Sequence, residues 1–184
     1  MLSPTTRIAV LGIALALAIV SGVRLVRRLR SNSLPSPSLA GVEPSALGQT
    51  RAIDAPEPER RSYRAPLGWD PDGSAWRRAN SEVYVHAWDV ARGVPVATPS
   101  ERRRAAELAA RLNHDSVQTP REYTVAGQPA FEFGITMGGG FWKLITYVFF
   151  DRTVMTVDCI GRDEERLRAF SACAAVVSSV AVSR

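Results

Sequence analysis

The stretch Phe141–Phe150 (FWKLITYVFF) decides the fold of this chain, together with Thr153–Ile160 (TVMTVDCI), which follows after two residues. The first segment is apolar at nearly every position, so we expect a central strand that is covered on both faces. Only Asp151 and Arg152 separate the two segments, which leaves room for no more than a tight turn. The sequence therefore predicts an antiparallel hairpin within a sheet.

Further strands are predicted before this hairpin. In Val83–Val90 (VYVHAWDV) successive side chains alternate between two faces, which is typical of a strand. Ala130–Ile135 alternates in the same way, and Glu122–Val125 is predicted to be a short strand ahead of it. The glycines of Gly138–Gly140 indicate a turn into the hairpin.

Two helices complete the predicted fold. The first is capped by Thr98, because Pro99 suits the first helical position and Glu101 completes a capping box. Its apolar stripe consists of Ala105, Leu108, Ala109 and Leu112. The second helix follows the cap Asp163, and its apolar side holds Leu167, Phe170, Cys173, Ala174, Val177 and Val180. With both stripes packed on the sheet, the sequence predicts an α+β fold in which helices flank an antiparallel sheet.

The charge of the 184-residue chain, +5 in total, is divided unevenly. Residues 1–61 hold eight arginines and four acids, whereas residues 62–184 hold 15 basic and 14 acidic side chains. We expect three regions: a membrane anchor with a basic flank at 1–30, a disordered Pro/Ser-rich tether at 31–61, and a folded domain at 62–184. The basic excess lies outside the folded domain and has no interleaved aromatic residues, so nucleic-acid binding is not expected.

The anchor is predicted from Ile8–Val23, a run of 16 residues without charge. As a helix it is roughly 24 Å long, and extension beyond a snorkelling Arg24 lets it span a bilayer. Its basic flank consists of Arg24, Arg27, Arg28 and Arg30. No small-residue cleavage site ends the run, so we expect an uncleaved single-pass helix in the bacterial inner membrane. A cleaved signal peptide and a buried soluble helix are the alternatives.

Two features of the sequence favour opposite membrane orientations. Four arginines follow the span and only Arg7 precedes it, so the positive-inside rule places the C-terminal domain in the cytoplasm. Cys159 and Cys173 approach each other if the last helix folds back on the sheet, and a disulfide between them requires an oxidising compartment. Two buried thiols are the alternative. We favour the extracytoplasmic orientation.

Several short segments carry a resemblance to a known family. They are Ala65–Trp69 (APLGW), Val125–Phe133 (VAGQPAFEF), the two strands of the hairpin, and the helix end Val177–Val180 (VSSV). In this order they resemble the PsbP-like superfamily, which includes the DcrB-like proteins and some actinobacterial lipoproteins. The resemblance covers residues 62–182 and implies an α/β/α sandwich. It also implies a non-enzymatic assembly factor, adaptor or binding module, although this chain lacks the lipid-bearing Cys of the lipoprotein members.

No pattern in the sequence predicts a catalytic, metal or cofactor site. His114–Ser116 holds the residue types of a catalytic triad, but triad members come from separate elements and not from adjacent positions. Glu132 and Asp158 form a carboxylate pair only if their strands bring them together. The aromatic residues instead indicate a binding patch, for which the candidates are Trp88, Phe141 and Trp142. Core packing is the alternative for the last two.

These observations predict a non-catalytic binding, adaptor or assembly-factor domain, anchored at the cell envelope and engaging a protein or peptide partner. The alternative is a domain that binds a small ligand or lipid in a cleft lined by the aromatic residues. An enzyme is the least favoured class. Two His and two Cys give little basis for a metal site, and no cofactor is expected.

Overall fold

A computed structural model describes residues 45–53, 60–112, 114, 116–151, 153–162 and 165–183. The predicted anchor at Ile8–Val23, its arginine flank and the cap Asp163 lie outside these residues. Of the helices within the described ranges, none is long and apolar enough to cross a membrane.

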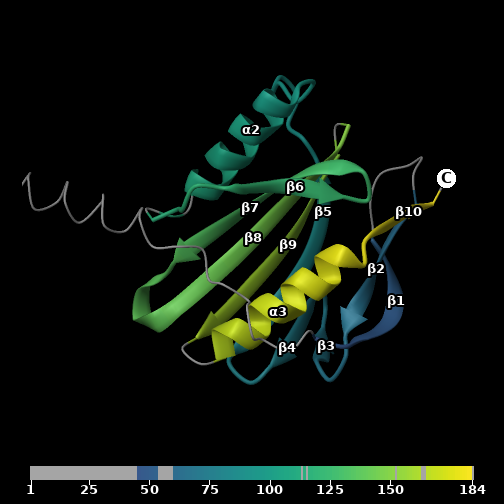
Figure 1. Cartoon of the computed structure of the whole chain (residues 1–184), viewed down its shortest axis with the longest axis vertical. Helices are drawn as coiled ribbons and strands as arrows, with labels where there is room; N and C mark the ends of the chain where they lie inside the picture. The colour runs from purple at the N-terminus through teal and green to yellow at the C-terminus, as the bar shows by residue number, and fades with distance from the viewer. Residues whose placement is uncertain are drawn as a thin grey trace, which may run out of the picture. The chain divides into compact units, whose positions relative to one another are not determined.

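The main element is a seven-stranded sheet in which all neighbouring strands are antiparallel (Figure 1). In spatial order its strands are β3 (Asp70–Asp72), β4 (Ala75–Arg78), β5 (Ser81–Asp89), β9 (Thr153–Arg162), β8 (Phe141–Phe150), β7 (Gln128–Thr136) and β6 (Arg121–Val125). Strands β5 to β9 cover the segments predicted to be strands. The sequence did not reveal β3 and β4, because three and four residues are too few for a periodic pattern.

The hairpin predicted from the sequence lies inside this sheet. Strand β8 pairs with β9 in a continuous register that runs from Phe150 opposite Thr153 to Phe141 opposite Arg162. In the turn, Asp151 has a φ of 47°, a conformation that Asp tolerates better than most residues. Every side chain from position 144 to 150 is buried. The prediction of a strand covered on both faces is therefore confirmed.

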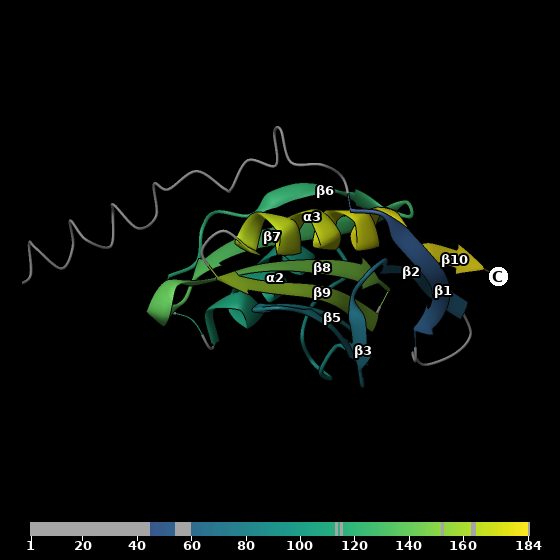
Figure 2. The same ribbon diagram turned by 90° about the horizontal axis from the view of Figure 1, so that it is seen from below.

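The two helices cover opposite faces of the sheet (Figure 2). Helix α3 (Glu165–Ser178) closes a core with β5, β8 and β9, whose largest members include Val83, Val148, Met155, Val157, Phe170 and Val176. Helix α2 (Pro99–Leu112) closes a second core over β7 and β8 that contains Phe131, Phe133, Ile135 and Phe149. The α+β arrangement of helices around an antiparallel sheet is as predicted.

A second, three-stranded sheet includes part of the segment that we expected to be a tether. It consists of β1 (Leu47–Ile53), β2 (Arg60–Pro66) and β10 (Ala181–Ser183), with β2 in the centre. Strand β1 and the first residues of β2 therefore correct the disordered tether predicted for 31–61. In β1 only Ile53 is buried, so the strand lacks the apolar alternation by which a sequence indicates a strand. Its pairing with β2 supplies the order instead.

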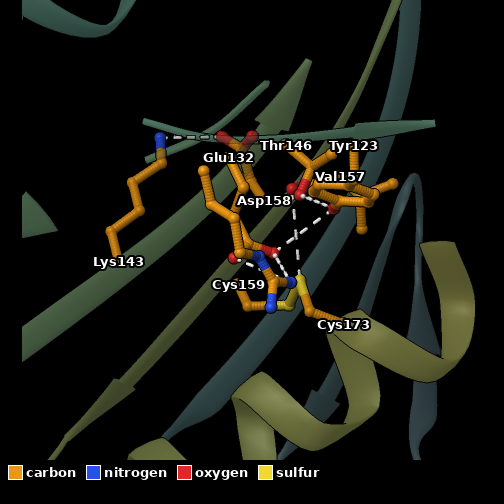
Figure 3. The surroundings of a disulfide bond; sticks show 9 residues. Tyr123, Glu132, Lys143, Thr146, Val157, Asp158, Cys159 and Cys173 are labelled. Atoms are coloured by element: carbon orange, nitrogen blue, oxygen red, sulfur yellow. Dashed lines mark hydrogen bonds and ion pairs between the residues drawn. A yellow bond between two sulfur atoms is a disulfide. The ribbon is translucent and has the colours of Figure 1, made fainter. Parts of the chain in front are cut away.

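A disulfide joins Cys159 of β9 to Cys173 of α3 (Figure 3). The two Cα atoms are 6.0 Å apart, which is a usual separation for a disulfide. Both residues are fully buried between the helix and the sheet. The bond therefore fixes the closing helix to a central strand, and the alternative of two free thiols does not apply to the structure.

Candidate binding site

Helix α2 begins with the capping box that the sequence predicts. The backbone N–H of Glu101 donates to Oγ1 of Thr98 at 3.3 Å, and the backbone N–H of Thr98 donates to Oε2 of Glu101 at 2.9 Å. Bonds to a carboxylate favour its ionised form. The bond from the backbone of Thr98 therefore holds the pKa of Glu101 below its ordinary value.

The face that α2 buries differs from the prediction. Ala106 and Ala110 are each 1% exposed, whereas Leu108 is 58% and Leu112 is 80% exposed. Of the predicted apolar stripe, Ala105 and Ala109 do pack against the core. The expectation is wrong for its two leucines, Leu108 and Leu112, which we call the leucine stripe. The sheet below the helix carries large rings, namely Phe131, Phe133, Tyr147 and Phe149. These rings fill the interface, so the helix approaches the sheet through its alanines.

An open apolar groove of about 490 Å³ lies between α2 and the sheet. The helix contributes Ala105, Ala106, Leu108, Ala109 and Leu112. The strands contribute Trp88, Tyr147, Phe149 and Val154, and the loop after β5 contributes Val90, Ala91 and Val94. We call this feature the α2 groove. Its volume lies in the range of small-molecule sites, roughly 300–1,000 Å³. The polar side-chain groups among the described residues that line it are one phenol and one indole.

Trp88 stands at the border between the α2 groove and a second cavity. Its side chain is 43% exposed. It ends a row of rings along β5, in which the centroids of Tyr84 and His86 are 5.7 Å apart and those of His86 and Trp88 are 6.4 Å apart. The second cavity, of about 500 Å³, is also lined by Arg51 and Trp76. His86 also lines this cavity. The described lining residues include no Asp or Glu, so no carboxylate lies beside this imidazole in the cavity.

The three aromatic residues proposed as one binding patch lie at two separate places. Trp88 pairs with Val154 near one end of β9, whereas Phe141 pairs with Arg162 at the other end. The interval is roughly 27 Å along an extended strand. The rings of Phe141 and Trp142 are half-buried, and each lies below an arginine guanidinium, at 5.5 Å and 4.8 Å. Only Trp88 therefore belongs to the α2 groove.

A polar cluster lies on the same face of the sheet as the groove. Nζ of Lys143 is 2.7 Å from Oδ2 of Asp158, and each side chain is only 16% exposed (Figure 3). The other oxygen, Oδ1, is buried and has no hydrogen-bond partner among the described residues. Burial lowers the pKa of His114, and Lys143 lowers it further. The pKa of Tyr147 is raised, mainly by burial and to a lesser extent by the charge of Asp158. Since Lys143 neutralises Asp158, the cluster adds no net charge beside the groove.

Glu132 and Asp158 lie on opposite faces of the sheet and do not form a carboxylate pair. Glu132 lies on the α3 face, where it accepts hydrogen bonds from Arg121 at 3.2 Å and Tyr123 at 3.3 Å. Burial and then the charge of Glu132 raise the pKa of Tyr123 to about 12. Among the residues that the structure describes, no three His, Cys, Asp or Glu side chains are placed to hold a metal ion. Asp115, in the middle of His114–Ser116, is not described.

Comparisons with known proteins bear on the fold. No family model and no curated protein matches this sequence. Among solved structures, LpqN, which is involved in cell envelope biogenesis of Mycobacterium tuberculosis, matches with a TM-score of 0.55 and 13% identity, over 74% of this chain and 91% of LpqN. Cyanobacterial PsbP from Synechocystis matches with a TM-score of 0.48 and 15% identity, over 82% of this chain and all of PsbP.

The likeness to LpqN shows a shared fold. The fold that the sequence resemblance implies is therefore supported by the likeness to LpqN.

Proposed function

We propose that this protein is a non-catalytic binding or adaptor domain of the bacterial cell envelope, and that the α2 groove is its binding site. The exposed leucine stripe carries this proposal. A helix on the surface of a globular domain normally turns its apolar stripe to the core, and contiguous exposed apolar surface marks interaction sites. Here Leu108 and Leu112 lie at the rim of an apolar groove that has Trp88 on its other side.

The envelope assignment is supported by two observations. LpqN, which shares the fold, is involved in cell envelope biogenesis. Disulfides form and persist in oxidising compartments, and this domain contains one between Cys159 and Cys173. We therefore assign the domain to the outer side of the inner membrane, with Ile8–Val23 as its single-pass anchor. The arginines at positions 24–30 favour the opposite orientation, and the disulfide outweighs them in this proposal.

Crosslinking in living cells tests the binding site. A photoreactive residue is introduced in the full-length chain at position 108, or at position 67 as a matched control, because Leu67 is a leucine of similar exposure, 60%, that does not line the groove. We expect a discrete adduct from position 108 only. Equal adducts from both positions, or no adduct from position 108, would refute the proposal.

The orientation is tested separately in spheroplasts. External protease should digest the C-terminal domain, and the same sample should contain no free thiol before reduction. Protection from protease together with two free thiols would show that the domain is cytoplasmic.

A second function, binding of a small ligand or lipid, is favoured by the composition of the α2 groove. The described residues of its lining have aliphatic and aromatic side chains with almost no group that hydrogen-bonds. Such a site suits hydrocarbon better than a polar ligand, because a buried polar group without a partner is costly.

A further inference from the structure

Three exposed arginines lie next in the sequence to residues that line the α2 groove. Arg104 precedes Leu108 by four positions and Arg111 follows it by three, so both neighbour this leucine on the surface of α2, where Glu107 also neighbours both arginines. Arg92 lies in the loop between Ala91 and Val94, which both line the groove. All three arginines are exposed, and none takes part in the ion pairs of the described residues.

The acidic residues of α2 are engaged elsewhere. Oε1 of Glu107 is 3.1 Å from Nε of Arg103, and Nη1 of Arg103 is 2.7 Å from Oε1 of Glu122 in β6. Glu101 caps the helix. On the sheet side, Asp89 accepts a bond from the hydroxyl of Thr153 at 3.4 Å. Asp89 keeps its charge, and Asp151 lies nearby beside Val94. Among the described residues, the three unpaired arginines near the groove therefore outnumber these two exposed carboxylates, beside an uncharged floor.

We infer that the α2 groove binds a single-chain amphiphile with an anionic headgroup, of which a fatty acid is the simplest. This inference rests on the proposed function, since it names the class of ligand for the same site. The hydrocarbon chain lies between α2 and strands β5, β9 and β8, where the lining is apolar. The headgroup lies at the rim, where Arg104 and Arg111 donate to it.

An acyl chain fits this groove better than a polypeptide does. An extended peptide would bury its own N–H and C=O groups against a lining that cannot pair with them. Among the described strands below the groove, β9 and β8 are paired on both sides, and only β5 has an open edge, beyond Tyr84. A helical partner places anchors over two turns, whereas Leu108 and Leu112 cover only about 6 Å of α2.

Equilibrium dialysis of the full-length chain tests the inference. The chain is placed in phosphatidylcholine nanodiscs, so that no detergent competes, and binding to empty nanodiscs is subtracted. We expect radiolabelled dodecanoate to occupy one saturable site per chain. Its affinity should fall by about fourfold for each methylene removed, as measured with decanoate and octanoate, because each buried methylene contributes a similar free energy. Dodecanol should bind about tenfold more weakly than dodecanoate.

A charge reversal separates the headgroup from the chain. The double variant Arg104→Glu/Arg111→Glu should lose dodecanoate affinity by about tenfold and should gain binding of dodecylamine. Arg78→Glu is the matched control, because Arg78 is an exposed arginine of β4 outside the groove, and it should bind as the wild type does.

The possible failures are distinguishable. Equal binding of dodecanol and dodecanoate would overturn the anionic headgroup. Saturable binding of an acidic amphipathic helical peptide, without binding of dodecanoate, would overturn the acyl chain and leave the groove as a protein site. Absence of saturable binding by every probe would overturn the inference, while adducts at position 108 would still support the proposed function.

Discussion

Cys159 and Cys173 are bonded through their sulfur atoms across the interface between β9 and α3. A second close approach lies between them in the sequence. A Cβ atom on Gly161 would meet Cα of Arg166 at 2.6 Å and Cβ of Ala169 at 3.1 Å. The N-terminal half of α3 thus packs directly on the backbone of β9, and its middle is covalently tied to the same strand.

Loss of the disulfide is expected to destabilise the domain by about 3 kcal/mol, because the bond closes a loop of 14 residues in the unfolded chain. Urea unfolding of the double variant Cys159→Ala/Cys173→Ala measures this change. Reductant should lower the stability of the wild-type protein by a similar amount and leave the variant unaffected. A wild-type transition that does not respond to reductant would contradict the prediction.

Gly161→Ala is expected to lower the free energy of unfolding by about 1–3 kcal/mol, because the added methyl group overlaps the backbone of α3. Gly138→Ala is the matched control, since a Cβ there has no neighbour within 4 Å and the backbone does not require glycine. Thermal unfolding of both variants gives the comparison. Equal melting temperatures would show that α3 does not lie against Gly161.

Much of the large sheet was predictable, because its longer strands combine periodicity with abundant apolar residues. Phe141–Phe150 and Thr153–Ile160 identify a hairpin without further information. Strand β1 was not predictable, because its residues are largely polar and exposed and it is ordered by pairing with β2. Such pairing joins residues that are close in space but leaves no local pattern in the sequence.

The candidate site was predictable only in part. Trp88 is predicted from the sequence as part of a binding patch, and it lines the α2 groove. The alternation of a strand, however, gives the face on which a side chain lies and not its neighbours along the sheet. Phe141 and Trp142 lie beside the end of β9 opposite to the one that Trp88 contacts. The leucine stripe of α2 was visible in the sequence. It was assigned to the core because most apolar stripes are buried, and a helical pattern does not report which face meets the sheet.

The orientation of α2 gives a test by stability alone. Leu108→Ser and Leu112→Ser should each change the free energy of unfolding by no more than about 0.5 kcal/mol, because both side chains are exposed. Ala106→Leu should lower it by about 1–3 kcal/mol, because this position is fully packed against the sheet. Urea unfolding of the three variants decides the matter. Larger losses of stability in the two leucine variants than in Ala106→Leu would mean that the leucines face the core.

The ion pair between Lys143 and Asp158 should behave as a unit. Lys143→Met is expected to destabilise the domain by about 2 kcal/mol, because it leaves a largely buried carboxylate without its cation. The double variant Lys143→Met/Asp158→Leu should recover most of that loss, since no unpaired charge remains. Denaturant unfolding of the single and double variants forms the test. A double variant that is less stable than Lys143→Met would contradict the prediction.

Tyr123 should make the domain less stable at alkaline pH. Its pKa is raised from 10.0 to about 12 in the folded protein by burial and by Glu132. Below pH 10 the phenol is neutral in both states, so its contribution to stability is complete there. Between pH 10 and pH 12 the unfolded chain loses the proton and the folded protein keeps it, so the free energy of unfolding falls as the pH rises.

The expected loss from Tyr123 is about 1 kcal/mol at pH 11. Tyr123→Phe lowers stability at every pH, because it removes the hydrogen bonds to Glu132 and Thr146, but it should flatten the decline between pH 9 and pH 11. Urea unfolding at pH 9, 10 and 11 measures both slopes. Parallel slopes for the wild type and the variant would mean that Tyr123 ionises equally in the folded and unfolded states. Tyr84 and Tyr147 remain in both proteins, and their raised pKa values contribute to the decline that persists in the variant.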